Sequence, residues 1–195
     1  MEKLIEQGSF QAYADVRLNE AMSNINECAL YTRKRKTTVF ISHKHDDLQE
    51  LKGVLGFLQE QYDVKAYIDS QDTSMSPITT AATAANLKDR IKKCDKFILL
   101  ATNAAIDSKW CNWELGYGDA QKFKAHIALF PLKPKGSYDG FYKGAEYLSL
   151  YPYICYEDGN DKYDNGTYIQ KGYYTVTPEN GKLNYQTLAH WFSTR

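Results

Sequence analysis

A short segment of the sequence, Ser108–Leu115 (SKWCNWEL), brings together residue types that could do acid chemistry. Ser108 or the aspartate before it can cap the start of a helix. In that helix Trp110, Glu114 and Tyr117 follow one another at offsets of four and three residues, so they share one face. Aromatic rings beside a carboxylate exclude water from it and raise its pKa, which is typical of catalytic carboxylates. Glu114 is therefore a candidate catalytic residue.

The same segment also has a structural interpretation. Trp110, Trp113 and Leu115 could be core residues at helical spacing, with Glu114 at the rim of that core. Cys111 could act as a nucleophile only with a base beside it, and none is visible in the sequence, so we interpret it as a packing residue. The elements that position the segment decide between the two interpretations.

Runs of β-branched and aromatic residues alternate with helical patterns along the chain. The predicted strands are residues 38–42, 64–68, 96–101, 126–132 and 148–156. A helix capped by Asp46 or Asp47 follows the first strand, a helix over residues 84–93 precedes the third, and the helix bearing Glu114 follows it. This alternation predicts an α/β fold, a parallel sheet covered by helices on both faces.

In such a sheet, ligands bind outside the carboxyl ends of the strands, where the strand order reverses. For the common order 2-1-3-4-5 that point lies between the first and third strands. The first strand ends at Ser42 and His43, the third ends at Ala101 and Thr102, and the next helix brings Glu114. We expect these residues to line one crevice, which favours the functional interpretation of Glu114.

Other chemistries lack their sequence features. No glycine-rich turn follows the first strand, so neither the dinucleotide-binding fingerprint nor a P-loop is present. His43 and His45 are two residues apart, would face opposite ways in an extended segment, and have no obvious third ligand. We therefore expect no metal site and no bound cofactor.

Composition indicates a soluble cytoplasmic protein. The 195 residues carry 24 basic and 24 acidic side chains, so no net field attracts nucleic acid or a membrane. The basic run at 33–36 could touch phosphate, but before a buried strand it is more typical of a solvated linker. No segment resembles a signal peptide or a membrane span. The cysteines form no CxxC pair and are typical of reduced cytosolic thiols; they are Cys28, Cys94, Cys111 and Cys155.

The two ends of the chain differ from its middle. Residues 11–30 carry an apolar stripe that predicts a helix packed on the main body. Eleven of the sixteen tyrosines lie from Tyr138 onward. Asn-Gly pairs at 165–166 and 180–181 predict hairpins in a small antiparallel appendage, and residues 183–192 predict a closing helix. We predict three parts: residues 1–36, a domain over 37–156, and a tyrosine-rich β appendage over 157–195.

Several segments together resemble one family. They are VFISHKHDD at 39–47, YID at 67–69, LKDRIKKCDKFILLAT at 87–102 and SKWCNWELG at 108–116. Their order and content resemble the Toll/interleukin-1 receptor (TIR) domain, especially its bacterial, Thoeris-like branch, over roughly residues 37–155. The resemblance implies a flavodoxin-like fold with a five-stranded parallel sheet of order 2-1-3-4-5.

Many TIR domains cleave NAD+ between nicotinamide and ribose with the glutamate of a WxxxE motif, which Trp110 and Glu114 match here. The resemblance implies that Glu114 is catalytic and that the substrate contacts Ser42, His43, Asp69, Thr102 and Trp110. One carboxylate suffices, because nicotinamide leaves from a pyridinium and needs no proton. NAD+ is then a substrate, and no further cofactor is implied.

The resemblance also implies a biological role. The polar loop 69–80 would serve as substrate lid and as a contact for self-association with a neighbouring TIR domain. The product would be an ADP-ribose derivative, cyclic or conjugated, that signals to an effector protein in antiphage defence. The alternative is a TIR module without catalysis that only recruits protein partners, since the fold alone does not decide function.

Overall fold

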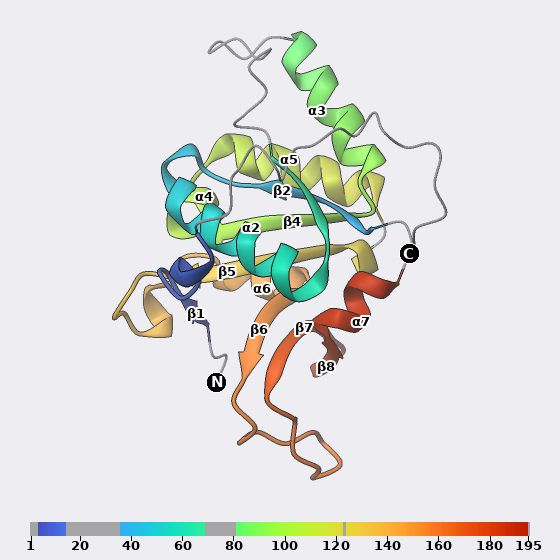
Figure 1. Ribbon diagram of the computed structural model, residues 1–195. Coiled ribbons are helices and arrows are strands. Elements are labelled where there is room, and N and C mark those ends of the chain that lie inside the picture. The colour runs from blue at the N-terminus through green and yellow to red at the C-terminus, as the bar shows by residue number, and fades with distance from the viewer. Residues whose placement is uncertain (1–3, 15–35, 69–80, 123, 195) are drawn as a thin grey trace.

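The computed structural model describes residues 4–14, 36–68, 81–122 and 124–194. These residues form one sheet with helices on both faces (Figure 1). Its strands are β1 (Ile5–Glu6), β2 (Thr38–Ser42), β3 (Lys65–Ile68), β4 (Lys96–Thr102), β5 (Ile127–Lys133), β6 (Tyr153–Glu157), β7 (Gly172–Glu179) and β8 (Lys182–Thr187). The α-helices are α2 (Leu48–Tyr62), α3 (Ala81–Lys93), α4 (Asn103–Ile106), α5 (Lys109–Gln121), α6 (Ala145–Leu150) and α7 (Leu188–Ser193). Short 3₁₀ turns are η1 (Gln11–Tyr13), η2 (His45–Asp47), η4 (Lys124–His126) and η5 (Asp139–Phe141).

The five predicted strands are β2 to β6, and they pair in the order β3-β2-β4-β5-β6 with all of these pairs parallel. This is the order 2-1-3-4-5 in the numbering of the predicted strands, and the predicted α/β fold class is confirmed. Parallel strands buried on both faces have continuous apolar sequences, which is why their positions could be read directly.

Successive residues of the central strands face opposite sides of the sheet. Phe97 and Leu99 belong to the core under α3 and α5, whereas Ile98 and Leu100 belong to the core under α2 and α7. Figure 1 shows these two helix layers on opposite sides of the sheet. Ser42 lies two residues after Phe40, which is in the core under α5. Its side chain therefore points towards the helix that carries Glu114.

The predicted fifth strand is too long at its start. Tyr153 is the first residue of β6, and the predicted strand residues up to Leu150 belong to helix α6, which buries Leu148. Pro152 has no N–H group and cannot continue that helix, so it separates the two elements. An apolar run alone does not distinguish a short buried helix from a strand.

The C-terminal hairpin continues the main sheet, because β7 pairs antiparallel with β6 and β8 with β7. Asn180 and Gly181 form its turn with φ of 51° and 75°, as the Asn-Gly pair predicts. The prediction of a helix over residues 183–192 is wrong in its first half. The two-residue turn brings Leu183 opposite Pro178, so the chain forms β8, and α7 begins only after Thr187.

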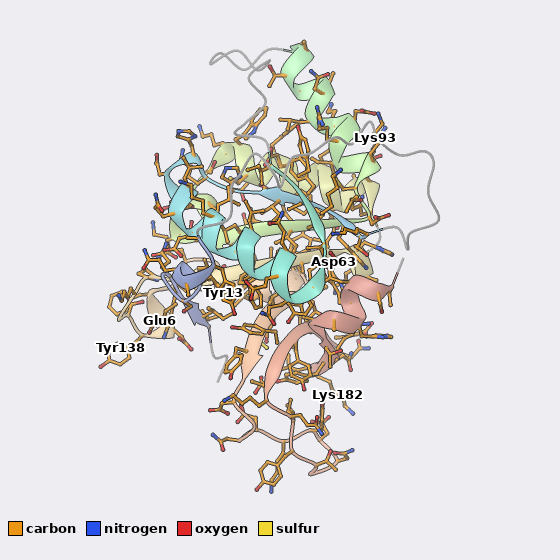
Figure 2. All side chains as sticks on the ribbon, viewed as in Figure 1. Glu6, Tyr13, Asp63, Lys93, Tyr138 and Lys182 are labelled. Atoms are coloured by element: carbon orange, nitrogen blue, oxygen red, sulfur yellow. The ribbon has the colours of Figure 1, made fainter. Side chains whose placement is uncertain are left out.

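The predicted N-terminal helix over residues 11–30 lies mostly outside the described residues. The described part contains β1, which the sequence did not predict and which pairs parallel with β5. Phe10 is buried against Phe57 and Phe130, with ring centroids 4.6 and 5.4 Å away. Tyr13 lies beside α2 (Figure 2), where its ring is 5.6 Å from that of Phe57.

The boundaries of the three predicted parts, residues 1–36, 37–156 and 157–195, stay a prediction. Among the described helices, none is long and apolar enough to cross a membrane.

Candidate active site

A buried hydrogen bond joins two predicted site residues at the carboxyl ends of the strands. The Ser42 Oγ atom donates to the Glu114 Oε2 atom over 2.5 Å, and each residue is 1% exposed. Helix α5 begins at Ser108, whose side chain accepts from the Cys111 N–H group at 3.3 Å. This cap sets the helix so that Glu114 points into the protein. Glu114 is thus buried, which is not the rim position of the structural interpretation.

The aromatic residues of α5 form a stack along the helix. The Trp110 and Trp113 rings are 4.8 Å apart, and the Trp113 and Tyr117 rings are 6.1 Å apart. The Lys88 Nζ atom lies 5.7 and 5.4 Å from the Trp113 and Tyr117 ring centres. These rings are half-buried and pack on the edge of the core. Helical spacing puts Trp110 and Tyr117 on the same side of α5 as Glu114, and the three rings are neither deep core nor free surface.

Thr102 lies at the end of β4, but its hydroxyl group is already engaged. It donates to the Asp47 Oδ2 atom over 2.5 Å and accepts from the Ala105 N–H group at 3.0 Å. Thr102 is fully buried and Asp47 nearly so. The pair connects the start of α2 to the end of β4, at the sheet edge where the crevice was predicted. In this structure Thr102 supports the site, and a substrate contact for it stays a prediction.

The sequence analysis did not predict that Asp47 pairs with Thr102. The sequence offered Asp46 or Asp47 as a helix cap, and Asp47 does occupy the N-cap position of α2. However, its side chain makes no capping hydrogen bond. Burial raises the pKa of its carboxyl group, against the lowering effect of the Thr102 hydrogen bond. The sequence did contain a signal for this pair, because Asp47 and Thr102 each follow a predicted strand and these two strands end at the same edge of the sheet.

His43 directly follows Ser42 and is 8% exposed. Its Nδ1 atom lies 3.5 Å from the Ile41 carbonyl oxygen. Burial lowers the pKa of the imidazole to about 4, against the raising effect of that backbone contact and with help from His45. The ring is therefore neutral at pH 7. His45 is exposed, and the described residues contain no group of three or more His, Cys, Asp or Glu side chains that could hold a metal ion.

Cys111 is buried beside the candidate site. Burial raises the pKa of its thiol group, and the nearby Glu114 carboxylate raises it further, against hydrogen bonds to Ser108 and Ser42. A protonated thiol is a poor nucleophile, which agrees with a packing role. Asp69 and the loop 69–80 lie outside the described residues. Of the other predicted site residues, the structure joins Ser42 to Glu114 by a hydrogen bond, and His43 follows Ser42 in the chain. Thr102 bonds to Asp47 and Trp110 stacks on Trp113, so their place in the site stays a prediction.

Two comparisons with known proteins show what this chain is similar to. A family model described as the TIR domain matches residues 39–165, a range that contains all the predicted site residues. The chain is 33% identical over 141 residues to the probable 3' cyclic ADP-D-ribose synthase ThsB' of Bacillus cereus (strain MSX-D12). That alignment covers 70% of this chain and 71% of the relative. The chain belongs to the TIR domain family.

Proposed function

We propose that this protein cleaves NAD+ between nicotinamide and ribose and closes the ADP-ribosyl part into a cyclic signal. The observation that carries the proposal is the buried Ser42–Glu114 pair at the switch point of the sheet. The similarity to a probable 3' cyclic ADP-D-ribose synthase supports the substrate and the product class.

A single carboxylate fits the first step. As the bond between C1 of the ribose and the pyridinium nitrogen breaks, its electron pair leaves with nicotinamide, which departs neutral and needs no general acid. Positive charge develops on the ribose, and Glu114 stabilises it from a buried position where electrostatic interactions are strong. The hydrogen bond from Ser42 holds the carboxylate in one orientation before the charge develops.

The neighbouring residues provide the frame for that carboxylate. The Asp47–Thr102 hydrogen bond joins the start of α2 to the end of β4, and Trp110 stacks on Trp113 along α5. NAD+ is the substrate in this proposal, and the reaction needs no resident cofactor or metal. The enzyme would then be a hydrolase or cyclase acting on an N-glycosyl bond.

The biological proposal rests on family resemblance. The protein works in the cytoplasm in antiphage defence of the Thoeris kind, and self-association completes its site through the loop 69–80. An effector protein that senses the nucleotide product is its downstream partner.

The direct test incubates the purified protein with NAD+, measures nicotinamide by chromatography and identifies the other products by mass spectrometry. The Glu114→Gln variant keeps the side-chain shape but removes the charge, and we expect turnover to fall by about 10²- to 10³-fold. Glu60→Gln, the same change on the exposed side of α2, is the matched control and should retain full activity. A Glu114→Gln protein of unchanged stability that keeps most of the activity would refute the catalytic assignment.

A further inference from the structure

The imidazole of His43 contains a buried nitrogen whose role the fold does not explain. Its Nε2 atom is shielded from solvent and has no hydrogen-bond partner among the described residues. Leaving a buried polar atom unpaired typically costs about 1–3 kcal/mol. Such atoms in native structures often mark a functional site, because a ligand supplies the missing partner.

The contact of the other ring nitrogen favours one tautomer of the neutral ring. The Nδ1 atom faces the Ile41 carbonyl oxygen at 3.5 Å, and a carbonyl oxygen can only accept a hydrogen bond. This contact favours the tautomer in which Nδ1 carries the proton of the neutral ring, and in that tautomer Nε2 carries a lone pair. Because burial keeps the pKa of this histidine at about 4, the lone pair is available at neutral pH. A neutral ring also adds no positive charge beside a cationic ribosyl group.

The position of His43 relates this lone pair to the proposed reaction. His43 is the residue after Ser42, and consecutive Cα atoms are about 3.8 Å apart. It lies just beyond the last residue of β2, at the same sheet edge as the Ser42–Glu114 pair. His43 therefore lies at the sheet edge where the ribosyl cation would form.

We propose that His43 is the general base of the product-forming step and that its Nε2 atom takes the proton of the hydroxyl group that closes the ring. This inference rests on the proposed function. The bond between ribose C1 and nicotinamide breaks, and its electron pair leaves with nicotinamide. The oxygen of a hydroxyl group elsewhere on the same substrate then forms a bond to C1. Its proton moves to Nε2, and the resulting imidazolium later returns the proton to solvent.

Other described groups near this edge are less suited to the role. Glu114 must keep its negative charge to stabilise the cation, and its Oε2 atom already accepts from Ser42. The Asp47 Oδ2 atom accepts from Thr102. The Cys111 thiol group is protonated, because burial raises its pKa.

The test replaces His43 by two residues that each keep one half of the ring's polar pattern. In His43→Gln the amide can reach the place of Nε2 but is not basic. In His43→Asn the amide reaches the place of Nδ1 and leaves Nε2 empty. The measured quantity is the ratio of cyclic product to linear ADP-ribose formed from NAD+. This ratio does not depend on how much of each variant is folded, because only folded molecules turn over.

General-base catalysis typically contributes about 10²- to 10⁴-fold, so we expect the cyclic-to-linear ratio to fall at least about tenfold in both variants. His45→Gln, an exposed histidine two residues later, should keep the wild-type ratio. A ratio unchanged in His43→Gln and His43→Asn overturns the role of His43 while leaving the proposed function intact. Wild-type protein that forms only linear ADP-ribose overturns this inference and the cyclisation step, but not NAD+ cleavage. Wild-type protein that releases no nicotinamide overturns both proposals.

Discussion

The hydrogen bond between Ser42 and Glu114 gives a quantitative prediction. Both residues are 1% exposed and their oxygen atoms are 2.5 Å apart, so water does not replace the hydroxyl group when Ser42 is changed to alanine. A hydrogen bond to a charged group typically contributes about 1.5–3 kcal/mol. If it is needed in the transition state, its loss lowers kcat by about 10- to 150-fold.

A double-mutant cycle separates orientation of the carboxylate from other effects of the serine. Nicotinamide release is measured for the wild type, Ser42→Ala, Glu114→Gln and the double variant. In the Glu114→Gln background the acceptor is a neutral amide, so the further loss from Ser42→Ala should be less than about tenfold. Urea unfolding of each variant shows whether the changes in rate follow changes in stability.

Ser149→Ala removes an exposed hydroxyl group from α6 and is the matched control, with no expected change in rate. The reasoning is refuted if Ser42→Ala keeps kcat within about twofold of wild type. It is also refuted if the serine costs the same factor with and without the Glu114 charge, because the two side chains would then act independently.

Four further predictions concern the frame of the site and its assembly. Thr102→Val should lower the free energy of unfolding by about 2–4 kcal/mol in urea titrations, because it removes the hydrogen-bond donor to the buried Asp47 carboxyl group and the side-chain cap of α4. Thr102→Ser keeps the hydroxyl group and should restore most of this free energy. Trp110→Ala should cost roughly 2 kcal/mol and slow turnover, because the ring is half-buried; no effect on either would show that the stack does not support the site. Between its folded pKa of about 4 and its ordinary pKa of 6.5, His43 binds fewer protons in the folded than in the unfolded state. Its contribution to the free energy of unfolding is therefore complete above pH 6.5 and is lost as the pH falls towards 4. Wild-type stability should therefore fall by roughly 3 kcal/mol more than that of His43→Gln over this range, and parallel curves would contradict the buried neutral ring. Specific activity should rise with protein concentration as the chain self-associates, and a flat dependence where light scattering detects assembly would remove that proposal.

The sequence alone determined the architecture and the main catalytic candidate. Buried parallel strands need apolar side chains on both faces, so β2 and β4 stand out as continuous apolar runs. The cap at Ser108 and the helical offset to Glu114 are local patterns that depend only on residues close in the chain. Because strand order in this fold follows from a few topological rules, these local patterns were enough to predict that Ser42 and Glu114 line one crevice, although not that a hydrogen bond joins them.

The tertiary structure decided every contact between residues far apart in sequence. Lys96 opens an apolar strand pattern as an ordinary charged residue, yet it is fully buried. Its Nζ atom lies 3.2 Å from the Thr194 hydroxyl group and 4.7 Å from the Trp191 ring, and burial lowers its pKa to about 8. The pairing of Asp47 with Thr102 is of the same kind. The periodicity of a sequence indicates which face of its own helix or strand a residue lies on. The partner that its side chain contacts depends on how separate helices and strands pack together.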